Sequence, residues 1–275
     1  MYDTIIIGTG CAGLAGAMYA GRLNLKTLVI GDIAGGTIIL TDTVENYPGF
    51  KKLTGQELAD KLLEHAKDYP VEIMEDKVAG VAEQGDGFLV KTEREGKDFL
   101  AKTIIIATGT RHKELDVPGE KQFHNKGVHN CALCDAPLYK NKTVAVVGGS
   151  DSAAKEALVL AQHAAKVYMI YRGEQIRPEP VNMKRIQAAK NIEIINHTNV
   201  LEIKGEKKVT QVMLDKPYQG SKEFKLDGVF VAIGLIPLSG LAKRLGVELN
   251  AKGEIIIDRE SRTNIPGVFA AGDVV

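Results

Sequence analysis

The 275-residue sequence predicts an α/β protein in which two domains are each built on a parallel sheet with covering helices. The main observation is an internal repeat: a short apolar strand enters a glycine-rich turn and an alanine-rich helix, over residues 4–23 and again over 143–163. In both copies a second strand follows, at 27–30 and at 166–171. A strand, a short turn, a helix and another strand form a βαβ unit, whose two strands lie parallel.

Shorter strands separated by glycine-containing turns follow each βαβ unit, and they predict an antiparallel β insert in each domain. The first insert contains the turns Gly85-Asp86-Gly87 and Glu95-Gly96, and the second is expected from about 192 to 230. Between the first unit and its insert, Thr54-Gly55-Gln56-Glu57 has the pattern of a capping box and predicts the start of a helix.

The order of these segments predicts a discontinuous first domain, residues 1–113 and 241–275, interrupted by a second domain over residues 114–240. Proline and glycine cluster near both junctions, at 116–119 and 237–240, as is typical of chain segments between compact regions.

Composition and charge exclude several classes of protein. The net charge is zero and 25% of the residues are charged, so no electrostatic footprint for nucleic acid or an anionic membrane exists. No apolar stretch approaches the roughly 18 residues of a membrane span, and we expect a cytoplasmic protein. Three cysteines are too few for a disulfide scaffold, and no second Cys/His pair completes a zinc site, so no metal is expected.

The first glycine-rich turn, Gly8-Thr9-Gly10-Cys11-Ala12-Gly13, fits the G-x-G-x-x-G pattern of a Rossmann-like nucleotide-binding domain. The first glycine permits a tight turn, the second lets a pyrophosphate approach the backbone, and the third lets helix and strand pack closely. Cys11 is interpreted as a small packing residue. After the next strand, Asp32 is either the acid that binds a ribose or a solvated loop charge.

The second turn, Gly148-Gly149-Ser150-Asp151-Ser152-Ala153, predicts another nucleotide site, with Ser150 in place of the second glycine. After the following strand the expected acid is missing, and Arg172 and Arg177 are present instead. Two arginines and no acid favour the 2′-phosphate of NADPH over NADH. The alternative is that both arginines are solvated.

The sequence Cys131-Ala132-Leu133-Cys134-Asp135 places two thiols where they can form and break a disulfide. Such a pair, in a chain with two nucleotide-binding turns, predicts a reductase. Asp135 is either an acid that handles protons of the thiols or a charge at a helix N-terminus.

In the order of these motifs, the chain resembles the low-molecular-weight thioredoxin reductases (class II of the FAD-dependent pyridine nucleotide-disulfide oxidoreductase family) over essentially its whole length. The resemblance also rests on Gly35-Gly36, Glu45-Asn46-Tyr47-Pro48-Gly49, Ala107-Thr108-Gly109 and Phe269-Ala270-Ala271-Gly272-Asp273. It implies a homodimeric enzyme that passes electrons from NADPH through FAD and the cysteine pair to thioredoxin. FAD is then expected in the first domain, and NADPH and the dithiol in the second.

The resemblance also implies roles for individual residues. Cys134 would be the thiol nearer the flavin, Cys131 its disulfide partner and Asp135 the acid. The expected FAD-binding residues are Gly8, Gly10, Gly13, Gly31, Gly36, Thr37, Asn46, Thr108, Gly109, Gly272 and Asp273. The expected NADPH-binding residues are Gly148, Ser150, Ala153, Arg172 and Arg177.

The sequence departs from the family pattern at several points. Ser150 interrupts the second glycine motif, Gly173 replaces a middle arginine, and Thr37 stands where glutamine is usual. Because the sequence ends at Val275, soon after the Gly-Asp motif, we expect the helix that follows this motif in the family to be missing, which leaves FAD retention and dimerisation open. Two alternatives therefore remain: a flavin-dependent thioredoxin reductase using ferredoxin or NADH, and a non-catalytic nucleotide-binding, redox-sensing protein.

Overall fold

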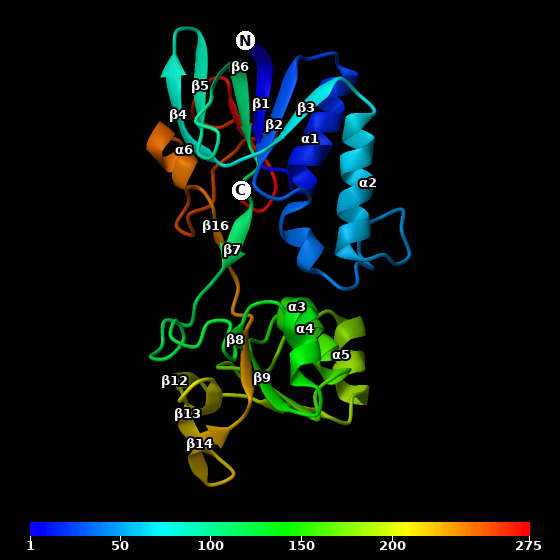
Figure 1. Ribbon diagram of the computed structural model, residues 1–275, viewed down its shortest axis with the longest axis vertical. Coiled ribbons are helices and arrows are strands. Elements are labelled where there is room, and N and C mark those ends of the chain that lie inside the picture. The colour runs from blue at the N-terminus through cyan, green and yellow to red at the C-terminus, as the bar shows by residue number, and fades with distance from the viewer. The chain divides into compact units, whose positions relative to one another are not determined.

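The computed structural model describes residues 1–275 and divides by its internal contacts into two compact units (Figure 1). The first unit comprises Met1–Arg111 and Ile236–Val275, and the second comprises His112–Leu235. The connecting segments form two short strands, β7 (Thr110–His112) and β16 (Leu235–Pro237), which pair with each other.

The first unit is built on one sheet with the strand order β3-β2-β1-β6-β5-β4, in which β17 also pairs with β6. Five strands run parallel to their neighbours, and β5 and β4 continue the sheet antiparallel beyond β6. The predicted insert thus extends the parallel sheet itself. The strands are β1 (Tyr2–Ile7), β2 (Thr27–Gly31), β3 (Val71–Glu75), β4 (Val78–Gln84), β5 (Gly87–Thr92), β6 (Asp98–Ile106) and β17 (Val268–Ala270).

Helices α1 (Cys11–Arg22) and α2 (Gly55–Lys67) lie side by side on one face of this sheet (Figure 1). The predicted capping box is present: the Thr54 hydroxyl accepts from the Glu57 N–H, and the Glu57 carboxylate accepts from the Thr54 N–H. Ile6, Leu14 and Val29 form the core under α1. The opposite face packs against helix α6 (Gly240–Leu245), and the short 3₁₀ helix η1 (Gly36–Leu40) precedes α2.

The second unit has a five-stranded, fully parallel sheet with the order β11-β10-β9-β15-β8. Helix α4 (Asp151–Ala161), helix α5 (Pro180–Ala188) and the short helices α3 (Ala132–Asp135) and η2 (Ala136–Tyr139) pack on one face. The strands are β8 (Val128–His129), β9 (Thr143–Val147), β10 (Lys166–Ile170), β11 (Ile192–Ile195) and β15 (Gly228–Val231).

The antiparallel insert of the second unit is a separate three-stranded sheet, β12 (Val200–Gly205), β13 (Val209–Tyr218) and β14 (Ser221–Lys225). The expected insert from about 192 was too long, because β11 pairs in parallel with β10 and belongs to the main sheet. Periodicity alone does not distinguish a four-residue edge strand of the parallel sheet from the start of a hairpin.

The two-domain α/β architecture predicted from the sequence is confirmed. None of the helices combines the length and the apolar character that crossing a membrane requires.

Candidate active site and nucleotide-binding turns

The first glycine-rich turn joins β1 to α1, and two of its glycines are required by packing. A Cβ on Gly13 would lie 1.9 Å from the Gly8 carbonyl oxygen, and a Cβ on Gly8 would lie 2.1 Å from that of Ala107. Gly10 differs, because the nearest atom to its Cβ would be the Gly35 carbonyl oxygen at 3.9 Å. The protein leaves open space at Gly10, where the fingerprint expects a pyrophosphate to approach the backbone.

Two segments distant in sequence reach this turn. The Gly35 N–H donates to the Thr9 carbonyl at 2.8 Å, and a Cβ on Gly36 would lie 3.1 Å from the Gly10 Cα. A Cβ on Gly272 would lie 2.7 Å from the Ala12 Cβ, so the Gly272-Asp273 turn reaches the first turn of α1. The structure therefore brings together Gly8, Gly10, Gly13, Gly36 and Gly272 and places Asp273 beside them.

Other expected FAD contacts lie around this centre. Gly31 ends β2 against Thr9, and the Thr108 N–H lies near Gly8. Thr37 is exposed on η1, and Asn46 is exposed in the following loop. A Cβ on Gly109 would meet nothing within 4 Å. Thr37 and Asn46 are thus exposed to solvent, whereas Gly109 is partly buried and its carbonyl accepts the Leu238 N–H at 2.9 Å. The contacts that join Gly36 and Gly272 to the glycine turn do not involve these three residues.

Cys11 is a free thiol that packs against the cluster of Val44, Leu53 and Leu58. Burial raises its pKa. This packing agrees with the interpretation of Cys11 as a small packing residue.

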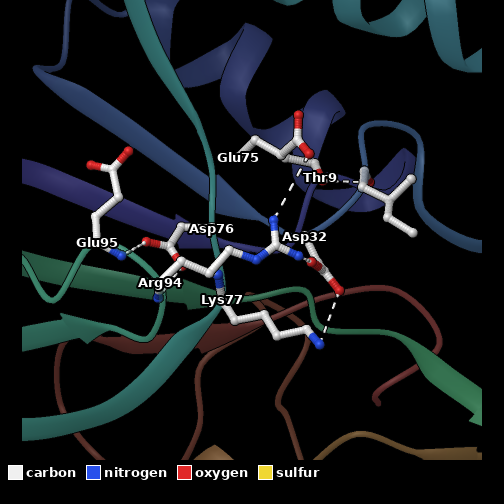
Figure 2. A network of polar contacts seen from close by, with 8 residues as sticks. Thr9, Asp32, Glu75, Asp76, Lys77, Arg94 and Glu95 are labelled. Atoms are coloured by element: carbon white, nitrogen blue, oxygen red, sulfur yellow. Dashed lines mark hydrogen bonds and ion pairs between the residues drawn. The ribbon is translucent and has the colours of Figure 1, made fainter.

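Asp32, at the end of β2, does not stand alone as a solvated charge. Its carboxylate forms ion pairs with Arg94 and with Lys77, the latter at 3.2 Å, and the Arg94 guanidinium also lies 3.9 Å from Glu75 (Figure 2). An exposed ion pair contributes about 0–1 kcal/mol, so a ligand hydroxyl can displace these partners at little cost.

Asp76 holds the two basic residues in place. This fully buried carboxylate accepts the backbone N–H groups of Lys77, Arg94 and Glu95 at 2.6, 2.9 and 3.0 Å (Figure 2). Burial raises the pKa of Asp76, but these hydrogen bonds outweigh burial and hold the pKa at about 2. The carboxylate thus fixes the two loops from which Lys77 and Arg94 reach Asp32.

The second glycine-rich turn joins β9 to α4. A Cβ on Gly148 would lie 2.2 Å from the Ala232 carbonyl oxygen and 3.0 Å from the Ala153 Cβ, so glycine is required at 148. Ser150 is exposed and is the N-cap of α4, where its hydroxyl accepts from the Ala153 N–H at 3.5 Å. The serine therefore caps the helix.

The two arginines expected to bind a 2′-phosphate are both exposed and follow β10. The Arg177 N–H donates to the Gly149 carbonyl at 2.7 Å, and its guanidinium donates to the Tyr171 hydroxyl at 3.2 Å. Arg177 is thus tied directly to the glycine turn. Arg172 lies next to Tyr171, whose ring fills the space beside Gly149 and Gly173.

Cys131 and Cys134 form a disulfide, with their Cα atoms 5.4 Å apart. Cys131 is buried and is the N-cap of α3, where its sulfur accepts from the Cys134 N–H at 3.2 Å. Cys134 is exposed. The pair belongs to the same unit as the second glycine turn.

Asp135, which follows Cys134, belongs to a polar chain of three residues. The Nδ1 atom of His129 lies 2.9 Å from an oxygen of Asp135, and its Nε2 lies 2.7 Å from the Tyr139 hydroxyl. His129 is buried, whereas the Asp135 side chain is 28% exposed. Burial lowers the pKa of His129 although Asp135 opposes this, and burial raises the pKa of Tyr139 to about 12. Both groups are therefore neutral near pH 7.

Glu156, on α4, is hydrogen-bonded to α3, the short helix of the cysteine pair. One of its carboxylate oxygens accepts the backbone N–H of Ala132 at 2.5 Å. Burial raises the pKa of Glu156 to about 7, opposed by this hydrogen bond and reinforced by the charge of Asp135. The link couples the cysteine pair to α4.

Six residues of these sites were not singled out from the sequence: Asp76, Lys77, Arg94, His129, Tyr139 and Glu156. A histidine two positions before the first cysteine was a visible signal, but only the fold shows that it faces Asp135. Within the chain no cluster of three or more metal-ligating side chains was found.

Two nucleotide-binding turns on parallel sheets and a redox-active disulfide define a dithiol oxidoreductase. The family described as pyridine nucleotide-disulphide oxidoreductase matches residues 2–275, and the chain belongs to this family. Members of this family use flavin and a pyridine nucleotide, and the resemblance noted in the sequence is confirmed.

Individual relatives agree with this assignment. The chain is similar to a thioredoxin reductase of Listeria innocua (41% identity, covering 100% of this chain and 86% of the relative) and to that of Bacillus subtilis (40% identity, 100% and 87%). The crystal structure of Lactococcus lactis thioredoxin reductase matches with a TM-score of 0.94 and 37% identity, over 100% of this chain and 90% of that one.

Proposed function

We propose that the chain is a thioredoxin-disulfide reductase that passes electrons from NADPH through FAD and the Cys131–Cys134 pair to a thioredoxin-like protein. The observation that carries the proposal is the disulfide on α3, coupled through Glu156 to the helix of the second nucleotide-binding turn. The similarity to thioredoxin reductases, which extends over the whole of this chain, supports the choice of substrate.

In this proposal the first unit binds FAD. The open backbone at Gly10 would accept the pyrophosphate, Asp32 the ribose and Asp273 the ribityl chain. The remaining contacts would come from the expected positions around the turn: Gly8, Gly13, Gly31, Gly36, Thr37, Asn46, Thr108, Gly109 and Gly272. When bound, the flavin supplies a two-electron carrier between nicotinamide and disulfide.

The second unit would bind NADPH. The α4 N-terminus with Gly148, Ser150 and Ala153 would face the pyrophosphate, because unpaired N–H groups at a helix N-terminus favour anions. Arg172 and Arg177 would donate charge-assisted hydrogen bonds to the 2′-phosphate.

The cysteine pair performs the final exchange. A thiolate of the reduced pair attacks the substrate disulfide; one sulfur–sulfur bond forms as another breaks, and a mixed disulfide results. The second cysteine then attacks the mixed disulfide and restores Cys131–Cys134. Two electrons pass to the substrate, which leaves as two thiols. We assign Asp135 the transfer of a proton from the attacking thiol to the leaving sulfur.

The proposed assembly is a homodimer working in the cytoplasm, where a reducing environment sustains thiol exchange. Size-exclusion chromatography with light scattering tests the oligomeric state, and a monomer would contradict it.

The function is tested by an anaerobic titration of the purified protein with NADPH and then NADH, followed by flavin absorbance. Bleaching by stoichiometric NADPH and subsequent turnover with thioredoxin are expected. Cys134→Ser and Cys131→Ser should each abolish thioredoxin reduction and preserve flavin bleaching.

A second candidate differs only in the electron donor, and the observation that favours it is Ser150, a helix cap where the family motif has glycine. If neither NADPH nor NADH reduces a bound flavin and reduced ferredoxin does, ferredoxin replaces NADPH as the electron donor. If disulfide reduction fails with every donor, the reductase proposal is wrong and a redox-sensing role remains.

A further inference from the structure

His129 is positioned to act on the proposed reaction through Asp135. Its ring stacks on Phe230 with centroids 5.2 Å apart and meets the Tyr139 ring edge-on at 5.5 Å. A Cβ on Gly228 would lie 2.4 Å from Tyr139, so glycine there leaves the room that the Tyr139 ring occupies. The imidazole is therefore held in one orientation by aromatic packing.

The packing fixes which nitrogen carries the proton. Tyr139 retains its proton near pH 7, and its one hydrogen-bond partner is the His129 Nε2 atom. A hydroxyl that donates to Nε2 leaves the proton of the neutral ring on Nδ1. The opposite tautomer would direct the Nδ1 lone pair at the Asp135 carboxylate, 2.9 Å away, and would repel it.

The Nδ1 atom has no acceptor other than this carboxylate. The oxygen of Asp135 lies close but off the axis of the N–H bond, and the buried Nδ1 has no hydrogen bond elsewhere. A buried donor without a partner is costly, so the ring favours a carboxylate turned toward it.

We propose that the Tyr139–His129 pair is the positioning device for Asp135: the Tyr139 hydroxyl donates to His129 Nε2, and His129 Nδ1–H donates to the carboxylate. The inference rests on the proposed function, in which Asp135 takes the proton of the attacking thiol and returns it to the leaving sulfur. His129 remains neutral and holds the carboxylate for both transfers.

The other titratable groups near the Tyr139–His129–Asp135 polar chain do not take over the contact that His129 makes with Asp135. Glu156 acts on Asp135 from α4, Asp227 acts on Tyr139, and the exposed His124 acts on His129. These interactions are through space, whereas His129 is the group within 3 Å of the Asp135 carboxylate.

The test compares two disulfide substrates offered to the reduced, purified full chain. Attack on a dialkyl disulfide releases a basic thiolate, which needs a proton. Attack on an aromatic disulfide releases a stable thiolate, which does not. His129→Phe keeps the ring stack and removes both nitrogens. We expect this variant to slow exchange with hydroxyethyl disulfide about tenfold, because one hydrogen bond to a charged group is lost. Exchange with dithiobis(nitrobenzoate) should not change.

A conservative variant and a double-mutant cycle complete the design. His129→Asn retains an N–H near the Nδ1 position and should restore most of the dialkyl rate. In an Asp135→Asn background, His129→Phe should have no further effect. Equal slowing of both substrates, or of neither, overturns the proposal.

Nitrogen-15 spectra of the histidine rings provide a measurement that does not depend on rates. The resonances of His129, assigned by comparison with His129→Asn, should show the Nδ1–H tautomer at pH 7, and Tyr139→Phe should shift them toward a mixture of tautomers. An Nε2–H tautomer in the unmodified chain overturns the proposal even if His129→Phe does not fold.

Neither readout uses NADPH, flavin turnover or thioredoxin. If thioredoxin is not reduced but the substrate discrimination and the tautomer are as expected, the proposed function fails and the positioning of Asp135 by His129 stands.

Discussion

Glu156 on α4 accepts the backbone N–H of Ala132, the residue that follows Cys131. This hydrogen bond joins the helix of the second glycine turn to the helix of the cysteine pair, two segments 24 positions apart in the sequence. The acceptor is the Glu156 carboxylate, and burial raises its pKa to about 7. The strength of this hydrogen bond therefore changes near neutral pH.

Glu156 should make stability depend on pH. The folded-state pKa of about 7 lies above the ordinary value of 4.5, so the stabilising contribution is complete below about pH 4.5 and is lost as pH rises through 7. The loss has an upper limit of about 3 kcal/mol, since one pKa unit corresponds to about 1.4 kcal/mol. Glu156→Gln keeps an acceptor for Ala132 and should flatten the dependence. Guanidinium unfolding between pH 5 and 8 measures how the free energy of unfolding changes with pH in the unmodified chain and in the variant. Equal pH dependence in the two would exclude the Glu156 carboxylate as its source.

Gly10 and Gly13 should respond differently to alanine. Gly13→Ala places a Cβ 1.9 Å from a backbone oxygen and should lower the melting temperature or prevent folding. Gly10→Ala meets no atom closer than 3.9 Å and should fold with a nearly unchanged melting temperature, while losing flavin. Thermal melts of the flavin-free proteins and the flavin-to-protein absorbance ratio measure the two effects. Full flavin occupancy in Gly10→Ala would show that the pyrophosphate lies elsewhere.

Arg172 and Arg177 should determine the preference for NADPH. Replacing either arginine with alanine removes a charge-assisted hydrogen bond to phosphate, which is worth about 1.5–3 kcal/mol, and should raise the KM for NADPH about tenfold or more. The KM for NADH should not change, and Glu174→Ala, an exposed neighbour, serves as the matched control. If NADPH and NADH are affected alike, the arginines do not contact a 2′-phosphate.

Asp76 should stabilise the loops that carry Lys77 and Arg94. Asp76→Asn weakens the acceptor of three backbone N–H groups and should lower the melting temperature at pH 7. Because the folded-state pKa is about 2, below the ordinary 3.8, the stabilisation is complete above about pH 4 and is lost as pH falls through 2. The difference between variant and unmodified chain should therefore shrink at pH 3. Asp86→Asn, in an exposed turn, is the control, and an equal effect at both positions would contradict the prediction.

The local patterns of the sequence predicted much of this molecule. The apolar runs 4–8 and 143–148, with their glycine turns, identified both βαβ units, because a buried parallel strand and a tight turn each demand particular residue types nearby in the chain. The C-x-x-C pair was recognised for the same reason, since the chemistry lies within four residues.

The tertiary structure decided what depends on distant segments. Only the fold shows that Asp32 is paired with Arg94 across 62 positions, that β11 joins the parallel sheet, and that Ser150 caps α4. It also decided that His129 and Tyr139 form a chain ending at Asp135, because burial, tautomer and hydrogen-bond direction depend on the residues packed around a side chain. The sequence by itself determined the fold class and the redox pair, because both depend on residues close together in the chain. Three-dimensional packing determined which side chains lie against Asp135 beside that pair.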